Sequence, residues 1–166
     1  PGQSGEMVIK GPNVTKGYWN KSDAENAACF TKDGYFLTGD IGYMDDDGWF
    51  FIVDRKKDLI LSGGFNVYPL TIENAIHQHP DVLEAMVIGV PDAYRGESAK
   101  AFVMLNPGAS EFSLDELKDF LADKLGRHEI PRHLEFRDEL PRTAVGKASR
   151  KMLKDQELAN AAEETA

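Results

Sequence analysis

Lys147 follows Gly146 at the end of a loop-like segment that starts at Pro141, and its ammonium group is the side chain best placed for chemistry. Proline and glycine favour turns, so this segment would present its last side chain to the surroundings. A cation held in this way could bind a phosphate or a carboxylate that another domain supplies. The alternative is a solvated surface lysine, as most lysines are. A Walker phosphate loop is excluded because Pro141 stands where that motif has glycine.

Two earlier segments also combine residue types that suit ligand binding. Asp40 follows Gly39 at the expected end of a strand, where its carboxylate could accept two hydrogen bonds from a sugar diol. Aspartate in such a position also caps the backbone of turns, so both interpretations stand. Further along, a charged break at residues 55–58 leads to Gly63 and Gly64. Paired glycines either let a backbone approach a ligand closely or form a tight hairpin turn.

Metal sites and nucleophilic catalysis are not indicated. No metal-ligand spacing occurs among the four histidines, which are His77, His79, His128 and His133. No Ser-His-Asp or Cys-His set can be assembled, and Cys29 is interpreted as a small buried hydrophobic residue. The acids of residues 45–47 lack the spacing and the distal glutamate of a calcium loop. The sequence therefore predicts no metal site of its own.

Composition narrows the classes of function. The chain has 166 residues, of which 42% are hydrophobic, and a net charge of −9, whereas nucleic-acid binding requires a basic stripe. A single cysteine excludes an internal disulfide framework and favours a reducing, cytoplasmic location. No apolar run approaches the roughly 20 residues of a membrane-spanning helix. Because the chain opens at Pro1 in loop-like sequence, we expect it to be a piece of a longer protein.

The first 54 residues are predicted to be rich in β-structure. Strands are expected at residues 6–10, 35–37, 42–44 and 49–53. The acidic turn at residues 45–48 would join the last two strands as a hairpin. Ser22 is expected to cap a short helix that ends at Cys29. So short a segment would not close a core of its own, so we expect it to be the edge of a larger domain.

The remaining residues predict a compact α+β unit. A small hairpin at residues 59–68 precedes a helix that begins at Pro69, and the later elements are strand, strand, helix, strand and helix. The strands are expected at residues 82–90, 99–105 and 133–136. The helices are expected at residues 114–125, ended by Gly126, and at 149–158, followed by a frayed tail. This order predicts a small sheet with helices packed on it.

Taken together, three ordered segments resemble the acyl-CoA synthetases, of the fatty-acid–CoA ligase type, within the adenylate-forming (AMP-binding) superfamily. Residues 35–40 (Tyr-Phe-Leu-Thr-Gly-Asp) resemble the Tyr-x-x-Thr-Gly-Asp motif of that family. Residues 53–60 (Val-Asp-Arg-Lys-Lys-Asp-Leu-Ile) and 63–69 (Gly-Gly-Phe-Asn-Val-Tyr-Pro), together with Glu73, resemble its hinge motif. Residues 141–147 resemble its final motif. The resemblance spans nearly the whole chain.

The resemblance implies two parts. Residues 1–56 would be the end of the last β subdomain of a large N-terminal domain, and residues 57–166 would be the C-terminal lid. The phosphate loop for ATP and the acyl pocket of the family belong to that large domain and are not found in this sequence. The large domain is therefore the expected partner of this chain, and the chain alone is expected to be inactive.

It also implies roles for individual side chains in the adenylation step. Asp40 would bind the ribose hydroxyls of ATP, with Arg55 near the same nucleotide. Lys147 would be the catalytic residue that contacts the α-phosphate and the substrate carboxylate. Mg²⁺ would accompany the phosphates and be bound mainly by the large domain.

For the second step, the resemblance implies a rotation of the lid about Lys57. The segment Gly63, Gly64 and Phe65 would then line the tunnel that admits the pantetheine arm of CoA. The implied reaction converts a fatty or related carboxylic acid, ATP and CoA into acyl-CoA, AMP and pyrophosphate. Two alternatives remain: an adenylation domain that loads a carrier protein, and a non-catalytic lid that acts as an interaction module.

Overall fold

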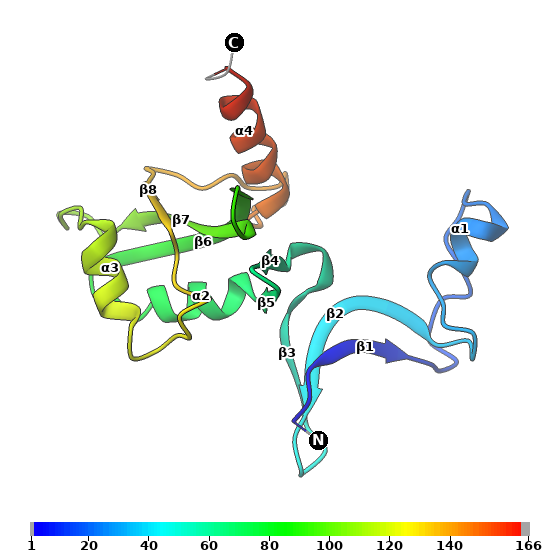
Figure 1. Cartoon of the computed structure of the whole chain (residues 1–166). Helices are drawn as coiled ribbons and strands as arrows, with labels where there is room; N and C mark the ends of the chain where they lie inside the picture. The colour runs from blue at the N-terminus through cyan, green and yellow to red at the C-terminus, as the bar shows by residue number, and fades with distance from the viewer. Residues whose placement is uncertain (1, 164–166) are drawn as a thin grey trace. The chain divides into compact units, whose positions relative to one another are not determined.

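The computed structural model describes residues 2–163, with side chains up to residue 160, and it contains two compact units, Pro1–Lys57 and Asp58–Ala166. Each unit has its own sheet (Figure 1). The break between the units falls within a short 3-10 helix, Lys56–Asp58. No helix among residues 2–163 is long and apolar enough to cross a membrane.

The first unit is built on a three-stranded antiparallel sheet in the order β1-β2-β3, with bounds Gly5–Ile9, Phe36–Met44 and Phe50–Arg55. The prediction of separate strands at residues 35–37 and 42–44 is wrong, because β2 runs through both. Gly39 adopts a φ of 72°, and the register with β3 shifts between Ile41 and Gly42. A glycine inside a strand marks an irregularity of this kind as often as it marks an end.

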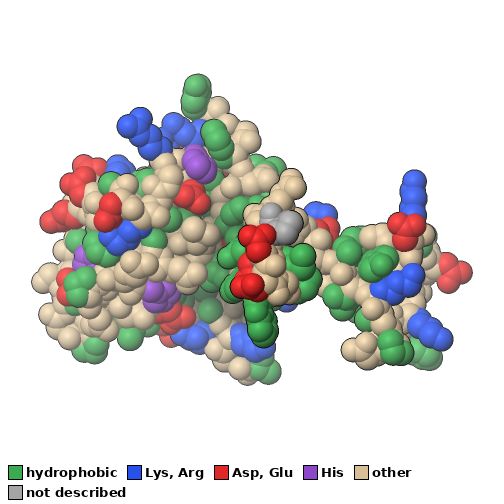
Figure 2. Space-filling view, turned by 90° about the horizontal axis from the view of Figure 1, so that it is seen from below, with side chains coloured by type: hydrophobic (Ala, Val, Ile, Leu, Met, Phe, Trp, Pro, Cys, Tyr) green, Lys and Arg blue, Asp and Glu red, His purple; other side chains and the backbone are tan. Residues whose placement is uncertain are grey.

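The hairpin between β2 and β3 is confirmed. Its turn is held by Asp45, whose Oδ1 accepts the N–H groups of Asp47 at 3.1 Å and Trp49 at 2.8 Å. These contacts give the first acid of the turn a structural role. Apolar side chains nevertheless reach the surface of this unit, and Figure 2 shows such side chains in green. Ile41 is the only large apolar side chain of the described part of the unit that is buried.

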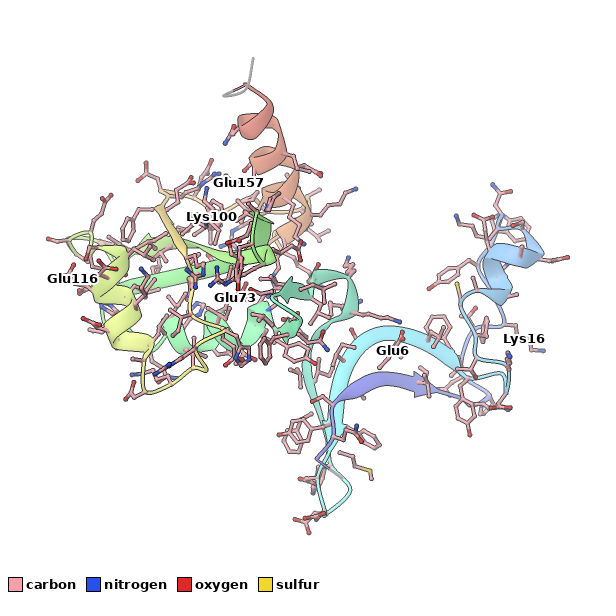
Figure 3. All side chains as sticks on the ribbon, in the orientation of Figure 1. Glu6, Lys16, Glu73, Lys100, Glu116 and Glu157 are labelled. Atoms are coloured by element: carbon pink, nitrogen blue, oxygen red, sulfur yellow. The ribbon has the colours of Figure 1, made fainter. Side chains whose placement is uncertain are left out.

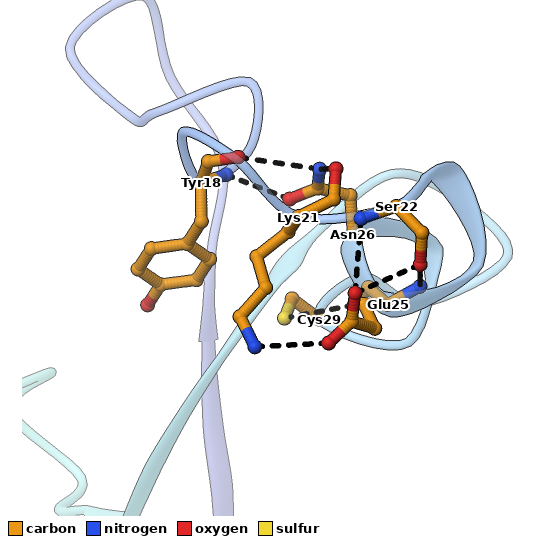
Figure 4. Close-up of polar contacts among 6 residues, drawn as sticks. All are labelled: Tyr18, Lys21, Ser22, Glu25, Asn26 and Cys29. Atoms are coloured by element: carbon orange, nitrogen blue, oxygen red, sulfur yellow. Dashed lines mark hydrogen bonds and ion pairs between the residues drawn. The ribbon is translucent and has the colours of Figure 1, made fainter.

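The short helix α1, Asp23–Ala27, begins as predicted at Ser22 and ends two residues before the predicted Cys29. Ser22 and Glu25 form a capping box, and the amide of Asn26 ties the helix to Tyr18 (Figure 4). Cys29 is half-buried, not buried as predicted, and its thiol donates to the Glu25 carbonyl at 3.4 Å.

The second unit has a sheet in the order β5-β4-β7-β6, and β8 pairs with β7. The strands are β4 Ile60–Ser62, β5 Phe65–Val67, β6 Val82–Asp92, β7 Gly96–Leu105 and β8 His133–Phe136. All pairs are antiparallel except β7 with β8, which is parallel. The two long strands β6, at one edge, and β7, beside it, make up most of the sheet and carry the residues on which the helices pack.

Both faces of the sheet are covered in this unit. On one face, residues such as Val87 and Ala101 pack against Ile72 and Ile76 of α2 (Pro69–Ile76) and against Leu117 of α3 (Leu114–Leu121). The opposite face forms a second core from Met86, Ile88, Phe102, Leu140 and Leu153. Leu153 belongs to α4, Arg150–Glu163, which lies on the other side of the sheet from α2 (Figure 1). The predicted order of elements from Pro69 onward is confirmed.

Two further predicted helix ends are wrong, in addition to that of α1. The helix α3 stops at Leu121 and is followed by turns, in which the N–H of Leu125 still bonds to the Leu121 carbonyl at 3.0 Å. Gly126 therefore lies beyond the helix, where its N–H donates to Glu129 at 2.8 Å. The last helix reaches Glu163, past the predicted end at residue 158. The alanines in this stretch favour a helix, which explains the extension; the rest of the predicted tail, residues 164–166, lies outside the described residues.

Candidate functional site

Asp40 and Arg55 face each other at the end of the β2–β3 ladder. They are register partners, and Arg55 Nε lies 2.6 Å from Asp40 Oδ1. Thr38 braces this point, because its hydroxyl donates to the Met7 carbonyl at 2.7 Å and accepts the N–H of Asp40 at 3.1 Å. Within the described residues, the Asp40 carboxylate bonds to Arg55 and caps no backbone N–H. The geometry leaves part of the carboxylate open to a ligand, as its side chain is 22% exposed.

The segment next to this pair is charged and exposed. Glu6 accepts the N–H of Gly39 at 3.3 Å and pairs with Lys56 at 2.7 Å. Lys57 is exposed and is the last residue of the first unit. Its position places the predicted hinge residue at the division between the two units. Whether the chain turns there remains a prediction.

Gly63 and Gly64 form the two-residue turn between β4 and β5. Their φ angles are 58° and 85°, and the strand residues on either side, Ser62 and Phe65, are register partners. A turn with positive φ at both central residues is the kind in which glycine is strongly favoured. Gly63 N–H also donates to the Arg95 carbonyl at 2.9 Å. The hairpin interpretation is therefore confirmed, and the turn leaves a small, side-chain-free surface.

Phe65 stands beside this turn and is exposed. Its ring stacks on the ring of His128, with centroids 4.5 Å apart and an angle of 25° between the planes. His128 was not predicted to have a site role, and no feature of its sequence position indicated this contact. The stack places two aromatic rings beside the glycine turn.

Lys147 lies on a closed loop of the second unit. Thr143 N–H donates to the Lys147 carbonyl and Gly146 N–H donates to the Thr143 carbonyl, each at 2.8 Å. Ser149 N–H donates to the Pro141 carbonyl at 2.9 Å, which closes the base of the loop. Gly146 has a φ of 79°, as the turn requires. The backbone of Lys147 is thus fixed, while its ammonium has no hydrogen-bond or ion-pair partner among the described residues.

Two arginines flank this loop, and sequence reasoning missed both. The guanidinium of Arg142 pairs with the carboxylate of Glu84 on β6. Arg150, at the first position of α4, pairs with Glu73 of α2 at 2.5 Å. One signal was available: Glu73 lies on the apolar stripe of its helix, beside Ile72 and Ile76, where a carboxylate requires a partner.

A second cluster of charges joins β7, β8 and α4, away from this loop. Lys100 Nζ lies 2.8 Å from Glu135 and 2.5 Å from Glu157 (Figure 3). Arg137 pairs with the same two carboxylates, at 2.7 Å and 3.4 Å. Burial of the Lys100 ammonium opposes its charge, but these contacts outweigh burial and raise its pKa above the usual value. The cluster binds α4 to the sheet and is a structural feature.

The candidate residues therefore divide between the units. Asp40 and Arg55 belong to the first unit, whereas the Gly63–Gly64 turn and Lys147 belong to the second. Each group is internally ordered. No group of three or more His, Cys, Asp or Glu within residues 2–163 is arranged to hold a metal ion.

Comparison with known proteins finds similar sequences along most of this chain. Residues 71–147 match the family described as the AMP-binding enzyme C-terminal domain. The chain is 49% identical to a long-chain-fatty-acid–CoA ligase of Bacillus subtilis over 96% of its own length, and 47% identical to a 2-succinylbenzoate–CoA ligase of Geobacillus kaustophilus over 93%. It spans only 28% and 31% of those two proteins.

A solved structure shows the same fold. The crystal structure of ATP-bound MatB from Rhodopseudomonas palustris matches with a TM-score of 0.86 and 40% identity, covering 93% of this chain and 30% of that protein. The two proteins are thus similar in sequence as well as in fold. The predicted fold class, a mixed structure with a small sheet and few helices, is confirmed.

Proposed function

Since this chain belongs to the adenylate-forming AMP-binding enzymes, whose C-terminal lid domain it contains, we propose that it is the C-terminal part of a carboxylate–CoA ligase. The observation that carries the proposal is the Lys147 loop. Its ammonium is exposed, has no partner among the described residues and stands on a fixed backbone, in a chain whose relatives are CoA ligases. A solvated surface lysine would not require such a braced loop.

In the first half-reaction, a carboxylate oxygen attacks the α-phosphorus of ATP. The bond between the α-phosphorus and the bridging oxygen breaks, and pyrophosphate leaves with the bonding electrons. Lys147 offsets the negative charge shared by the two approaching anions and holds them together. Asp40 accepts hydrogen bonds from the ribose hydroxyls, and Arg55 fixes the orientation of that carboxylate.

Mg²⁺ would neutralise the phosphate charge when ATP is bound. The described residues contain no group of three or more His, Cys, Asp or Glu arranged for a metal. We propose that the phosphates and the large domain supply most of its ligands. The side chains of this chain supply orientation and positive charge in place of metal ligands. This assignment of metal binding to the large domain agrees with the fact that the chain spans only 28% and 31% of the two relatives.

In the second half-reaction, the sulfur of CoA attacks the acyl carbon of the adenylate, and its proton passes to solvent. The bond from that carbon to the phosphate oxygen breaks, releasing AMP. We propose that the lid turns about Lys57 and withdraws Lys147 between the two steps. The Gly63–Gly64 turn and Phe65 would then form one wall of the passage for the thiol. The absence of side chains at this turn supports that role.

We propose a fatty acid as the substrate. Support comes from the fatty-acid ligase of Bacillus subtilis, the more similar of the two relatives compared above. The 2-succinylbenzoate ligase makes an aromatic acid the main competing substrate. The acyl pocket would lie in the large domain, so the lid residues described here do not distinguish between the two.

The test uses the full-length protein that contains this chain. Pyrophosphate exchange into ATP is measured with octanoate, palmitate and 2-succinylbenzoate, and thioester formation is measured with CoA and with a pantetheine-bearing carrier protein. We expect exchange with a fatty acid and thioester formation with free CoA. If none of the three acids supported pyrophosphate exchange, or if the acyl group passed only to the carrier protein and not to CoA, the proposal would be contradicted. The isolated chain serves as a control and should show neither activity.

A further inference from the structure

The loop that carries Lys147 is anchored at both ends by arginines. At one end, Arg142 pairs with Glu84 of β6, and its guanidinium also donates to the Gly146 carbonyl at 3.3 Å. At the other end, Arg150 begins α4 and pairs with Glu73 of α2. The first anchor ties the loop to β6 at the surface, and the second ties it to the largely buried carboxylate on α2. The Lys147 side chain makes no hydrogen bond or ion pair to this attachment within the described part of the chain.

The Arg150 anchor has the more restrictive geometry. Arg150 Nη2 lies 2.5 Å from Glu73 Oε2, and Arg150 Nε lies 3.0 Å from Glu73 Oε1. Two parallel hydrogen bonds of this kind fix the direction of both side chains. Glu73 lies between α2 and β6 (Figure 3), where Oε1 also accepts the N–H of Val87 at 2.8 Å. The carboxylate thereby connects α4, α2 and the sheet.

Arg150 also reaches the beginning of this unit. Its Nη1 lies 3.4 Å from Oδ2 of Asp58, the residue that follows Lys57. The same guanidinium therefore contacts both the start of the unit and α2. Arg150 is also bonded to Ser149, which closes the base of the Lys147 loop. A displacement of Arg150 would shift Ser149, whose N–H closes that loop.

Stability alone gives a weak reason for such a pair. Removing two charges from water is costly, and apolar residues of similar size often stabilise a protein equally well or better. The side chains of Arg150 and Glu73 are only 19% and 9% exposed, so this cost applies here. A bidentate ion pair does provide a fixed direction, which an apolar contact does not. Fixed direction is what a loop with a free catalytic ammonium requires.

We propose that Arg150, through Glu73, is a positioning residue for Lys147 in the adenylation half-reaction. The inference rests on the proposed function. In this proposal Arg150 acts through its contacts with Glu73 and Asp58 and not on ATP or the acid, and it sets where the loop holds the Lys147 ammonium. Loss of the pair should therefore impair the step that uses Lys147 and spare the step that does not.

The test compares Arg150→Lys and Glu73→Gln with the control Arg137→Lys in the full-length protein. The control makes the same chemical change at an arginine of similar exposure, 21%, whose ion pairs lie in the other charge cluster. Palmitate-dependent pyrophosphate exchange and thioester formation from synthetic palmitoyl adenylate are measured separately. We expect both test variants to lose about 10- to 100-fold in kcat/KM for exchange, a size typical of small misplacements of a catalytic group. Thioester formation should be unchanged, and the control should retain both activities.

A double variant, Arg150→Lys with Glu73→Gln, should be no worse than the poorer single variant, because the two residues act as one unit. Equal losses in both half-reactions would instead indicate a general effect on folding and overturn the proposal. An unchanged rate of pyrophosphate exchange in Arg150→Lys would overturn the proposal as well.

Hydrogen exchange gives a readout that does not depend on activity. The amides of Gly146, Lys147 and Ser149 should exchange faster in Arg150→Lys than in the wild type, while the β7 amides stay protected. If the wild type shows neither half-reaction with any acid, the proposed function fails. Hydrogen exchange at these amides then still decides whether Arg150 orders the loop. Equal hydrogen-exchange rates in Arg150→Lys and the wild type would show that Arg150 does not anchor it.

Discussion

Arg55 Nε lies 2.6 Å from Asp40 Oδ1, and the two residues are register partners on adjacent strands. The ion pair holds Oδ1 of the Asp40 carboxylate in place, and this also sets the direction of Oδ2 because the carboxylate is planar. A ribose diol would thus meet an acceptor whose direction is already set. The Arg55 side chain is 56% exposed, so the ion pair itself should contribute little to stability.

Asp40→Asn should raise the KM for ATP about 10- to 100-fold, because hydrogen bonds to a charged acceptor contribute about 1.5–3 kcal/mol. The free energy of unfolding should change by less than about 1 kcal/mol. Initial rates of pyrophosphate exchange at varied ATP, together with urea unfolding, provide the measurement. Lys21→Gln, which removes an exposed ion pair on α1, is the control and should leave the KM for ATP unchanged. An unaltered KM in Asp40→Asn would remove Asp40 from the nucleotide site.

Lys147→Gln should lower the rate of pyrophosphate exchange by about 100- to 1000-fold, the usual loss when one charge-stabilising group is removed from an active site. Thioester formation from supplied acyl adenylate should remain, because Lys147 acts only in the first step. Lys151→Gln removes another exposed lysine, in the first turn of α4, and should have no effect on either step. Equal losses of both half-reactions in Lys147→Gln would contradict the assigned role.

Lys57→Pro should slow thioester formation more than adenylation, because proline fixes φ at the point where the lid is proposed to turn. Lys57→Ala removes the same charge while keeping φ free, so it should behave as the wild type. Single-turnover rates of the two half-reactions separate the effects. A Lys57→Pro enzyme with a normal second step would place the hinge elsewhere.

Local signals predicted the order of the elements well. The capping boxes at Ser22 and Ser113 start α1 and α3 where expected, since each depends on residues only three apart. The end of α3 was predicted too late because Leu125 continues the apolar spacing beyond the helix. It remains partly buried against the core from a turn, so packing preserved the pattern after the helix had ended.

Long-range pairs could not be predicted in the same way. Arg150 and Glu73 are 77 residues apart, and no spacing rule connects them. A glutamate between Ile72 and Ile76 indicates that some cation must approach, but several arginines could satisfy it. Only the packing of α4 across the sheet selects Arg150. Lys147, by contrast, could be proposed from glycine and proline alone, because its exposure depends on a local turn.

The charge cluster of Lys100 and Glu135 predicts a specific dependence of stability on pH. Burial alone would raise the pKa of Glu135, but hydrogen bonds from Lys100 and Arg137 outweigh it and lower that pKa. The contribution of Glu135 to stability is therefore complete above the unfolded pKa of about 4.3 and is lost as the pH falls through the lower folded value. For Lys100, whose pKa is raised, the contribution is complete below about 10.4 and is lost as the pH rises through the folded value.

Glu135→Gln should therefore reduce the free energy of unfolding at neutral pH and flatten its decline toward acid pH. Urea unfolding is measured at a series of pH values through the amide signals of β7, which belong to this unit. Tryptophan fluorescence would not report on it, because both tryptophans lie in the other unit. Asp119→Asn, on the exposed surface of α3, is the matched control and should keep the wild-type profile. If Glu135→Gln declined as steeply in acid as the wild type, the cluster would not be the source of the pH dependence. In that case α4 would be held to the sheet by the apolar contacts of Leu153, which do not respond to pH.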